Sequence, residues 1–479
     1  MRRYFFLLLL PWVASMTLQA FPSLVLKDEM IYATVRGQYL GIYEDERQLG
    51  IQDVMRFPSD SFYVVYKIPT NKNKKAVYWL CFKLDNQDAK DKKWLLEFFD
   101  HHINEVALYT TKADGSIEKI RSGDRMAFSQ RKFWHKNIVF DLNLPYRQSK
   151  TYYIRIKSEN ENVIMPELRS YERFISYALS EYYLLGLFYG ILLVMALYNF
   201  LLFLAIRRVT YLYYVLYVLS MIFQTMCLNG LGFQFVWPKH PWINGIGMDL
   251  SVFMTMLFSV MFTKDFLHFE RHFPKVTRML NLMLMLRAIS VIVGVVFFPT
   301  WGASWRWLDL IPFTITCVAA ITCFVREDST SRYFVIAFTL VYVMLTINIL
   351  EMYGLIWSDI FTVYSLNIGI VLEIIFLSIS LADQLRREIR QKEVAQAQLI
   401  EQMKQSELIS QRVNRELEAK VRQRTIELNE ANEKLKTQVK DTTLMNLQLD
   451  TQNWNLRKDV TEIAQKRILR PVVDLKEFS

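Results

Sequence analysis

Two long apolar segments without a charged residue constrain the fold of this chain more than any other feature. They cover residues 184–206 and 211–235. Each is long enough to cross a bilayer as a helix, which takes about 20 residues. Because the lipid offers no hydrogen-bond partner to the backbone, an isolated segment of this kind has to be helical. The chain is therefore expected to be held in a membrane by several helices.

Five further apolar runs follow, and with the first two they predict a bundle of seven transmembrane helices. Three of these runs contain a single ionisable residue, which is Asp249, Arg287 or Glu373. The run at 310–325 is short, but Trp305 and Trp307 extend it. The predicted spans are 184–206, 211–235, 242–262, 279–298, 310–325, 333–350 and 360–382.

The three ionisable residues inside the spans allow two interpretations. Charged groups in a bilayer cost a few kcal/mol and usually face the interior of the bundle. Arg287 could form an ion pair with Glu373 or Asp249 that acts as a switch. Alternatively the pair is structural, or Arg287 extends its guanidinium group to the membrane surface. The structural interpretation is the simpler one and is preferred.

The N-terminus and the loop charges give two independent predictions of orientation, and these agree. Residues 1–20 have two arginines, a short apolar core and a small residue at Ala20, as in a secretory signal peptide. Export of the following domain makes the loops after spans 1, 3 and 5 cytoplasmic. These loops hold the excess of Lys and Arg, which the positive-inside rule requires. We expect a bacterial inner-membrane protein with its N-terminal domain outside and its C-terminus in the cytoplasm.

The segment 21–178 has the pattern of an exported all-β domain. Short runs rich in Tyr, Phe, Val and Ile alternate with turn residues. Short strands at fairly regular spacing are typical of an antiparallel sandwich. The expected strands are IYATV, FYVVY, VYWLCFKL, WLLEFF, VALYTT, NIVFDL and TYYIRI, which begin at residues 31, 62, 77, 94, 106, 137 and 151.

Four ring-bearing side chains of this domain are candidate ligand contacts. Such rings could stack on a sugar, but aromatic residues of a β-sandwich are more often part of the core. The adjacent His101 and His102 do not predict a metal site, because neighbouring residues of a strand point to opposite faces. We expect no metal and no other cofactor. The four candidates are Tyr78, Trp79, Trp134 and His135.

Residues 384–465 have the pattern of a long cytoplasmic coiled coil. No glycine follows Gly369, and Pro471 is the only proline in this part of the chain. Apolar residues recur in heptads, with a slip of one residue near 419–420, and such slips alter the supercoil locally. Leucine at d with asparagine at a is typical of a parallel dimer, although a helix packed along another protein is the alternative. The asparagines expected to set the dimer register are Asn432, Asn446 and Asn453.

The sequence also resembles a known family over about residues 30 to 390. The resemblance is carried by WLLEFFDHHINEVALYTTKADG from Trp94 and SGDRMAFSQRKFWHKNIVFDLNLP from Ser122 in the exported domain. It is most specific in GLFYGILLVMALYNFLLFLAIRRVTYLYYVLYVLS from Gly186, and it continues in CLNGLGFQFVWP from Cys227 and LEIIFLSISLADQL from Leu372. These segments resemble the bacterial seven-transmembrane receptors with diverse intracellular signalling modules.

The resemblance implies a receptor with an exported jelly-roll-like sandwich of carbohydrate-binding type. In this family the output modules, which include histidine kinases and nucleotide cyclases, follow the coiled coil. The present chain has no histidine after His272 and no glycine after Gly369, so neither a phosphoacceptor histidine nor a glycine-rich nucleotide site is expected. We therefore expect a non-enzymatic receptor, with no catalytic residue of its own.

The predicted function is to sense a small extracytoplasmic ligand, for which a carbohydrate is one candidate class. The signal of ligand binding would pass through the seven helices to a homodimeric coiled coil. A cytoplasmic kinase or regulator would supply the output in trans. A membrane scaffold that recruits partners through the coiled coil and a transporter are the alternatives. The net charge of +10 is explained by cytoplasmic loops beside lipid, so no direct nucleic-acid binding is expected. The expected parts are a signal peptide at 1–20, the sensor domain at 21–178, the membrane domain at 179–383, the coiled coil at 384–465 and a tail at 466–479.

Overall fold

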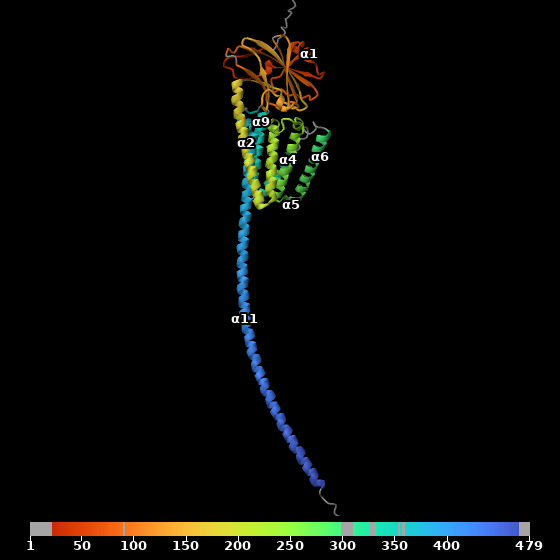
Figure 1. Ribbon diagram of the computed structural model, residues 1–479, viewed down its shortest axis with the longest axis vertical. Helices are drawn as coiled ribbons and strands as arrows, with labels where there is room; N and C mark the ends of the chain where they lie inside the picture. The colour runs from red at the N-terminus through yellow and green to blue at the C-terminus, as the bar shows by residue number, and fades with distance from the viewer. Residues whose placement is uncertain are drawn as a thin grey trace, which may run out of the picture. The chain divides into compact units, whose positions relative to one another are not determined.

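The computed structural model describes residues 22–89, 92–112, 114–297, 310–325, 332–352, 355–356 and 360–468. The predicted signal peptide, the tryptophans Trp305 and Trp307 and the tail beyond Ile468 lie outside the described residues. The chain divides into two units, Met1–Leu385 and Arg386–Ser479. The first unit contains a β-domain followed by membrane helices (Figure 1).

The β-domain consists of two sheets, which confirms the predicted all-β domain. One sheet has the order β4-β3-β5-β10-β7-β8, with β1 paired to β5, and the other has the order β2-β11-β6-β9. Most neighbours are antiparallel, whereas β1 runs parallel to β5. The strands are β1 Leu24–Leu26, β2 Tyr32–Thr34, β3 Gly41–Asp45, β4 Tyr63–Val64, β5 Val77–Asn86, β6 Trp94–Phe98, β7 Glu105–Thr111, β8 Ile117–Ser122, β9 Ile138–Leu142, β10 Ser149–Lys157 and β11 Pro166–Ser170.

The main core of this domain lies between the two sheets. It joins Phe82 and Ile154 of the larger sheet to Leu96 and Phe140 of the smaller one. A second, smaller core covers the opposite face of the larger sheet, where Val54 of the short helix α1 (Ile51–Val54) packs on it. Because β5 is buried on both faces, its sequence is a nearly continuous apolar run rather than an alternating one. The jelly-roll connectivity implied by the family resemblance stays a prediction.

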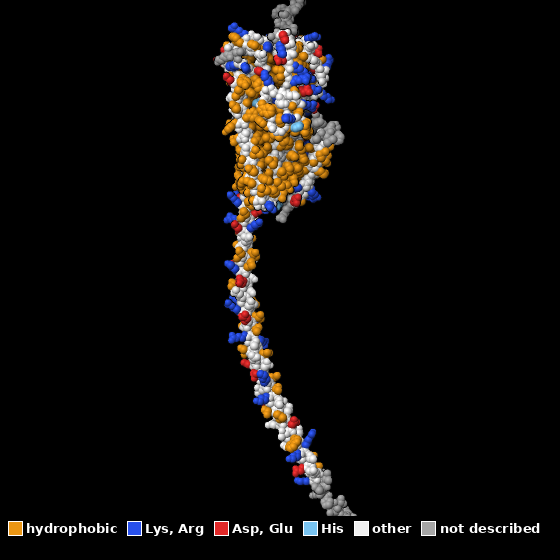
Figure 2. Space-filling view, viewed as in Figure 1, with side chains coloured by type: hydrophobic (Ala, Val, Ile, Leu, Met, Phe, Trp, Pro, Cys, Tyr) orange, Lys and Arg blue, Asp and Glu red, His pale blue; other side chains and the backbone are white. Residues whose placement is uncertain are grey.

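The membrane domain contains six helices in the described residues that are long and apolar enough to cross a bilayer. Hydrophobic side chains cover their outer surface in Figure 2. On the first helix, Leu187, Val194 and Leu201 recur every seven residues and are all more than half exposed, as expected for a face in contact with lipid. The spanning helices are α2 Tyr171–Ile206, α3 Val209–Leu228, α4 Trp242–Phe266, α6 Pro274–Phe297, α9 Arg332–Met352 and α11 Ser365–Ile468.

The fifth predicted span, 310–325, differs from the other six. It forms the helix α8 (Leu310–Val325), which has 16 residues. At about 1.5 Å per residue this helix is roughly 24 Å long, which is less than the hydrocarbon thickness of about 30 Å. Over the described part of the chain, the prediction of seven spans is therefore corrected to six helices long enough to span and one shorter apolar helix.

The first membrane helix begins earlier than its apolar run. The apolar run starts at residue 184, but α2 begins at Tyr171, directly after strand β11. The hydroxyl oxygen of Ser170 accepts a hydrogen bond from the backbone N–H of Arg173 at 3.3 Å and caps the helix. The polar first turns of α2 therefore continue the smaller sheet without a linker.

The last predicted span, 360–382, is divided by a break. The short helix α10 (Ile360–Val363) ends before Tyr364, and α11 begins at Ser365. From there α11 has 104 residues without interruption, including positions 419–420 where the heptads slip. The predicted long helix is confirmed, whereas its pairing into a parallel coiled coil stays a prediction. Asn432, Asn446 and Asn453 are exposed on this single helix.

Candidate functional site

A buried polar cluster joins the β-domain to the membrane helices. We call it the junction cluster and define it by Glu97, Lys136, Arg169, Glu181 and Tyr364. Glu97 lies on β6, Arg169 on β11 and Lys136 in the loop before β9, while Glu181 lies on α2 and Tyr364 immediately before α11. Buried charges are costly unless they are paired, so each charged group of this cluster needs a partner.

Glu181 is the residue shared by three parts of the chain. Its Oε1 lies 2.9 Å from Nζ of Lys136, and both side chains are at least nine-tenths buried. The hydroxyl of Tyr364 donates a hydrogen bond to the same Oε1. One carboxylate oxygen thus connects the β-domain, the first membrane helix and the residue that precedes α11.

A second connection runs beside the first. The backbone N–H of Lys136 donates to Oη of Tyr182 at 3.0 Å, and the Tyr182 hydroxyl donates to Oε1 of Gln234 at 2.8 Å. Nε2 of Gln234 donates a hydrogen bond to the carbonyl oxygen of Trp134 at 3.1 Å. Gln234 belongs to the helical turn η4 (Gly232–Val236), which follows α3. The loop before β9 is therefore fixed to both α2 and the end of α3.

Within the β-domain the cluster extends across the smaller sheet. Oε2 of Glu97 accepts from Nε of Arg169 at 2.8 Å, and Nη2 of Arg169 donates to Oε2 of Glu167 at 2.7 Å. The guanidinium of Arg169 also lies 4.4 Å from the ring centroid of Tyr177 on α2. Arginine suits this position because its planar group serves two carboxylates and an aromatic face together. Glu97 is bound on its other oxygen by Nδ2 of Asn137 at 2.7 Å.

Burial shifts the protonation of several groups in the cluster. Burial raises the pKa of Glu97 and of Glu167 above the ordinary value, and the nearby guanidinium of Arg169 opposes this rise. Burial lowers the pKa of His135 to about 4, with the positive charge of Lys136 acting in the same direction. His135 is therefore neutral at pH 7, and its Nδ1 accepts from the backbone N–H of Asn137 at 3.2 Å.

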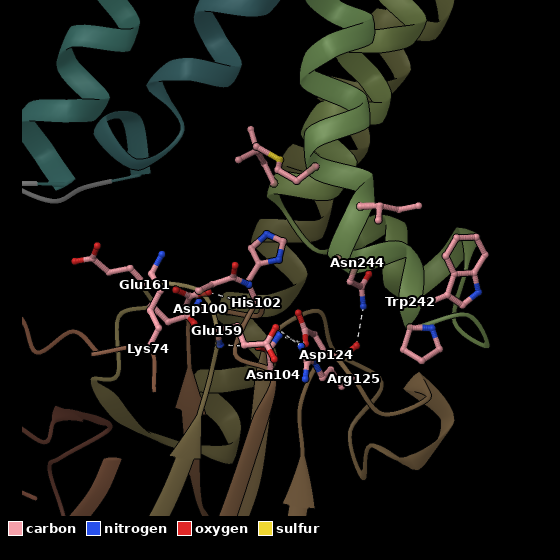
Figure 3. A pocket seen from close by; sticks show the side chains of 17 residues that line it. Lys74, Asp100, His102, Asn104, Asp124, Arg125, Glu159, Glu161, Trp242 and Asn244 are labelled. Carbon is pink, nitrogen blue, oxygen red and sulfur yellow. Dashed lines mark hydrogen bonds and ion pairs between the residues drawn. The ribbon is translucent and has the colours of Figure 1, made fainter. Parts of the chain in front are cut away.

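A cavity of about 660 Å³ lies between the β-domain and the start of α4. Figure 3 shows polar side chains from the β-domain on one side and the first turns of α4 on the other. Nδ2 of Asn104 donates to Oδ1 of Asp124, and Nδ2 of Asn244 on α4 donates to the Asp124 carbonyl oxygen, both at 2.9 Å. Burial raises the pKa of Asp124. These contacts tie the cavity wall to the membrane domain.

The remaining lining of the cavity is polar on the side of the β-domain and largely apolar on the side of the membrane helices. Nη2 of Arg125 pairs with Oε2 of Glu159 at 2.5 Å across one edge. Trp242, at the start of α4, is 65% exposed beside the opening. The polar lining residues include Lys74, Asp100, His102, Asn160, Glu161 and Asn162.

The four predicted ligand contacts do not form one site. Tyr78 and Trp79 are neighbours on β5 and enter separate cores on opposite faces of the sheet. Both side chains are at most 2% exposed, so they are core residues and neither presents an open ring face to a ligand. His135 is buried against the junction cluster, and Trp134 alone is open to solvent at 58%.

The intramembrane ionisable residues lie on three different helices. Glu373 on α11 accepts a hydrogen bond from the Tyr217 hydroxyl at 2.8 Å and is fully buried. Nη1 of Arg287 on α6 lies 3.4 Å from Oγ of Ser290, and Asp249 is buried on α4. The pairing of Arg287 with Glu373 or Asp249 stays a prediction. Glu373 instead serves to fix the first turns of α11 against α3.

The residues of the junction cluster were not among the predicted site residues. The signal for Glu181 was available, because it is an acidic residue three positions before the first apolar run. Had the helix been extended backwards from that run, Glu181 would have counted as a near-membrane carboxylate in need of a partner. For Lys136 and Tyr364 the sequence carries no comparable signal, since their proximity is created by the fold alone.

Comparison with protein families agrees with this architecture. Residues 181–384 match the family model described as 7TM diverse intracellular signalling, and residues 37–170 match 7TMR-DISM extracellular 2. No curated protein sequence matches the chain significantly. Because the two models match separate segments that together make up more than half of the chain, the chain belongs to the seven-transmembrane receptors with diverse intracellular signalling modules. It is a transmembrane receptor with an extracellular sensing domain at its N-terminal end.

Proposed function

We propose that this receptor detects a small polyhydroxylated ligand of carbohydrate type in the cavity between the β-domain and α4. Binding would alter how the β-domain rests on the membrane helices, and the junction cluster would pass this change to the start of α11. The dimeric coiled coil of α11 would then present the signal on the cytoplasmic side of a bacterial inner membrane. A kinase or regulator acting in trans would supply the catalytic output.

The main support for this proposal is that one oxygen of Glu181 contacts two partners from different parts of the chain. Its Oε1 is bound from one side by Lys136 of the β-domain and from the other by Tyr364, which precedes α11. A ligand can shift an equilibrium only through different affinities for the two states. A shared carboxylate supports such a difference, because a β-domain that withdraws Lys136 leaves the charge of Glu181 to its remaining partner Tyr364.

The choice of ligand class rests on the lining of the cavity. Carboxylates such as Asp100 and Glu161 accept hydrogen bonds from hydroxyl groups, and the amide of Asn160 can both accept and donate, so this lining is suited to a polyhydroxylated ligand. Trp242 offers an aromatic face at the opening. The volume of about 660 Å³ lies within the range usual for small-molecule sites.

Binding of sugars to the full-length receptor tests the sensing part of the proposal. In nanodiscs, a member of a panel of mono- and disaccharides is expected to bind in titration calorimetry. Trp242→Ala is expected to weaken that binding about fivefold, because one stacking contact is worth on the order of 1 kcal/mol. Trp454→Ala, at an exposed tryptophan of α11, serves as the matched control. Absence of sugar binding at millimolar concentration, or equal loss in both variants, contradicts the proposal.

Disulfide trapping tests the proposed dimer. Leu435 occupies a d position of the heptads, so Leu435→Cys is expected to give a covalent dimer of the full-length receptor under mild oxidation. Thr437→Cys, on the outer face of the same turn, is the control and is expected to remain largely monomeric. Equal trapping at the two positions would mean that the heptads do not define the interface.

A further inference from the structure

The outward face of the larger sheet carries a basic groove that adjoins the cavity beside α4, with Arg125 lining both. Three strands define its floor. Arg121 on β8 and Arg155 on β10 both lie opposite Ala107 on the central strand β7. Adjacent strands are about 4.8 Å apart, so the two arginines begin roughly 10 Å from each other with only a methyl group between them. This row leaves a gap flanked by two guanidinium groups.

The groove around this row has a volume of about 290 Å³. Its lining contains four cationic side chains and one carboxylate, which gives it a local excess of positive charge. The cations are Lys119, Arg121, Arg125 and Arg155, and the carboxylate is Glu105.

The contacts of these side chains leave much of the positive charge available. Nη1 of Arg155 lies 3.7 Å from Oε2 of Glu105, and Nζ of Lys119 lies 5.2 Å from the ring centroid of Tyr109. Arg125 pairs with Glu159, at the border with the other cavity. Among the residues that the structure describes, no hydrogen bond or ion pair of the Arg121 guanidinium is found, and its side chain is exposed. Like charges gathered on neighbouring strands are unfavourable unless an anion balances them.

We propose that this groove binds a small soluble polyanion that carries carboxylate or phosphate groups. Guanidinium groups bind both kinds of anion through paired, charge-assisted hydrogen bonds, and here two of them face one gap. The small volume excludes a bulky ligand and suits a compact molecule with two or three anionic groups. Arg121 and Arg155 line this groove and not the cavity beside α4, so the proposal does not depend on the sugar site or on the relay through Glu181.

Titration of the full-length receptor with citrate and with inorganic phosphate tests this site. In nanodiscs of phosphatidylcholine, citrate is expected to bind, and the affinity is expected to fall as salt is added because exposed charges are screened. The double variant Arg121→Gln/Arg155→Gln is expected to bind citrate at least tenfold more weakly. A higher affinity for phosphate than for citrate would assign the site to phosphorylated ligands. A higher affinity for citrate would assign it to polycarboxylates.

The control removes the same charge elsewhere. Arg36 and Arg56 are exposed arginines of the β-domain outside the groove lining, and Arg36→Gln/Arg56→Gln lowers the net charge by the same amount. This control is expected to change citrate affinity less than twofold, with an unchanged melting temperature for both double variants. No binding of either anion, or an equal loss in the two double variants, overturns the proposal and identifies the groove as ordinary solvated surface.

Discussion

Glu181→Met is expected to destabilise the full-length receptor by roughly 3–5 kcal/mol, the usual cost of removing one partner of a buried ion pair. The reason is that Nζ of Lys136 remains buried at the junction without the carboxylate that it contacts at 2.9 Å. Tyr364 loses its acceptor in the same variant. The free energy of unfolding in mixed detergent micelles measures the effect.

The matched control for this experiment lies on the same helix. Glu172 is an exposed carboxylate in the first turn of α2. Glu172→Met is expected to cost no more than about 1 kcal/mol, because it loses only a favourable interaction with the helix dipole. If Glu181→Met were no worse than this control, the junction cluster would not be a stabilising contact between the two domains.

Arg169→Met is expected to lower the free energy of unfolding of the full-length receptor by a similar amount, about 3–5 kcal/mol at neutral pH. Its removal leaves Glu97 and Glu167 buried without the cation that both contact. Arg169→Lys is expected to recover only part of the loss, since a lysine keeps the charge but cannot donate to two carboxylates in the same plane. Arg173→Met, at an exposed arginine of α2, is the control.

The pH dependence of this variant has a definite sign. Burial already raises the pKa of Glu97 and Glu167, and loss of Arg169 removes the interaction that opposes the rise. When the pKa of a carboxyl is higher in the folded state, folding is favoured at low pH and disfavoured as pH rises. The loss of unfolding free energy in Arg169→Met relative to wild type is therefore expected to be larger at pH 7.5 than at pH 5. A loss that does not depend on pH would argue against buried carboxylates as its cause.

The parts of the fold that follow from local composition could be predicted from the sequence. Uncharged runs of more than 20 residues locate α2 and α3, because no other structure satisfies the backbone in lipid. The lack of glycine after Gly369, and of proline between Gly369 and Pro471, predicts the long α11. The short α8 could not be distinguished from a full span, because its neighbouring tryptophans extend the apolar pattern.

The junction could not be predicted, because it depends on residues brought together by tertiary structure. Glu181 was overlooked because the helix was counted from the apolar run that begins at residue 184, whereas the Ser170 cap starts it at Tyr171. No glycine or proline stands beside Tyr364, so the sequence does not predict the break in the helix at this residue. Tyr78 and Trp79 were candidates by residue type alone, and burial on the two faces of β5 decides against both.

The central claim is that one carboxylate couples the β-domain to the beginning of α11. A double-mutant cycle with Lys136→Met and Tyr364→Phe, measured as free energies of unfolding of the full-length receptor, tests it most directly. We expect a coupling energy of about 1 kcal/mol or more between the two positions, and we expect it to be lost when the cycle is repeated with Glu181→Met. Additivity within about 0.5 kcal/mol in the presence of Glu181 would contradict it.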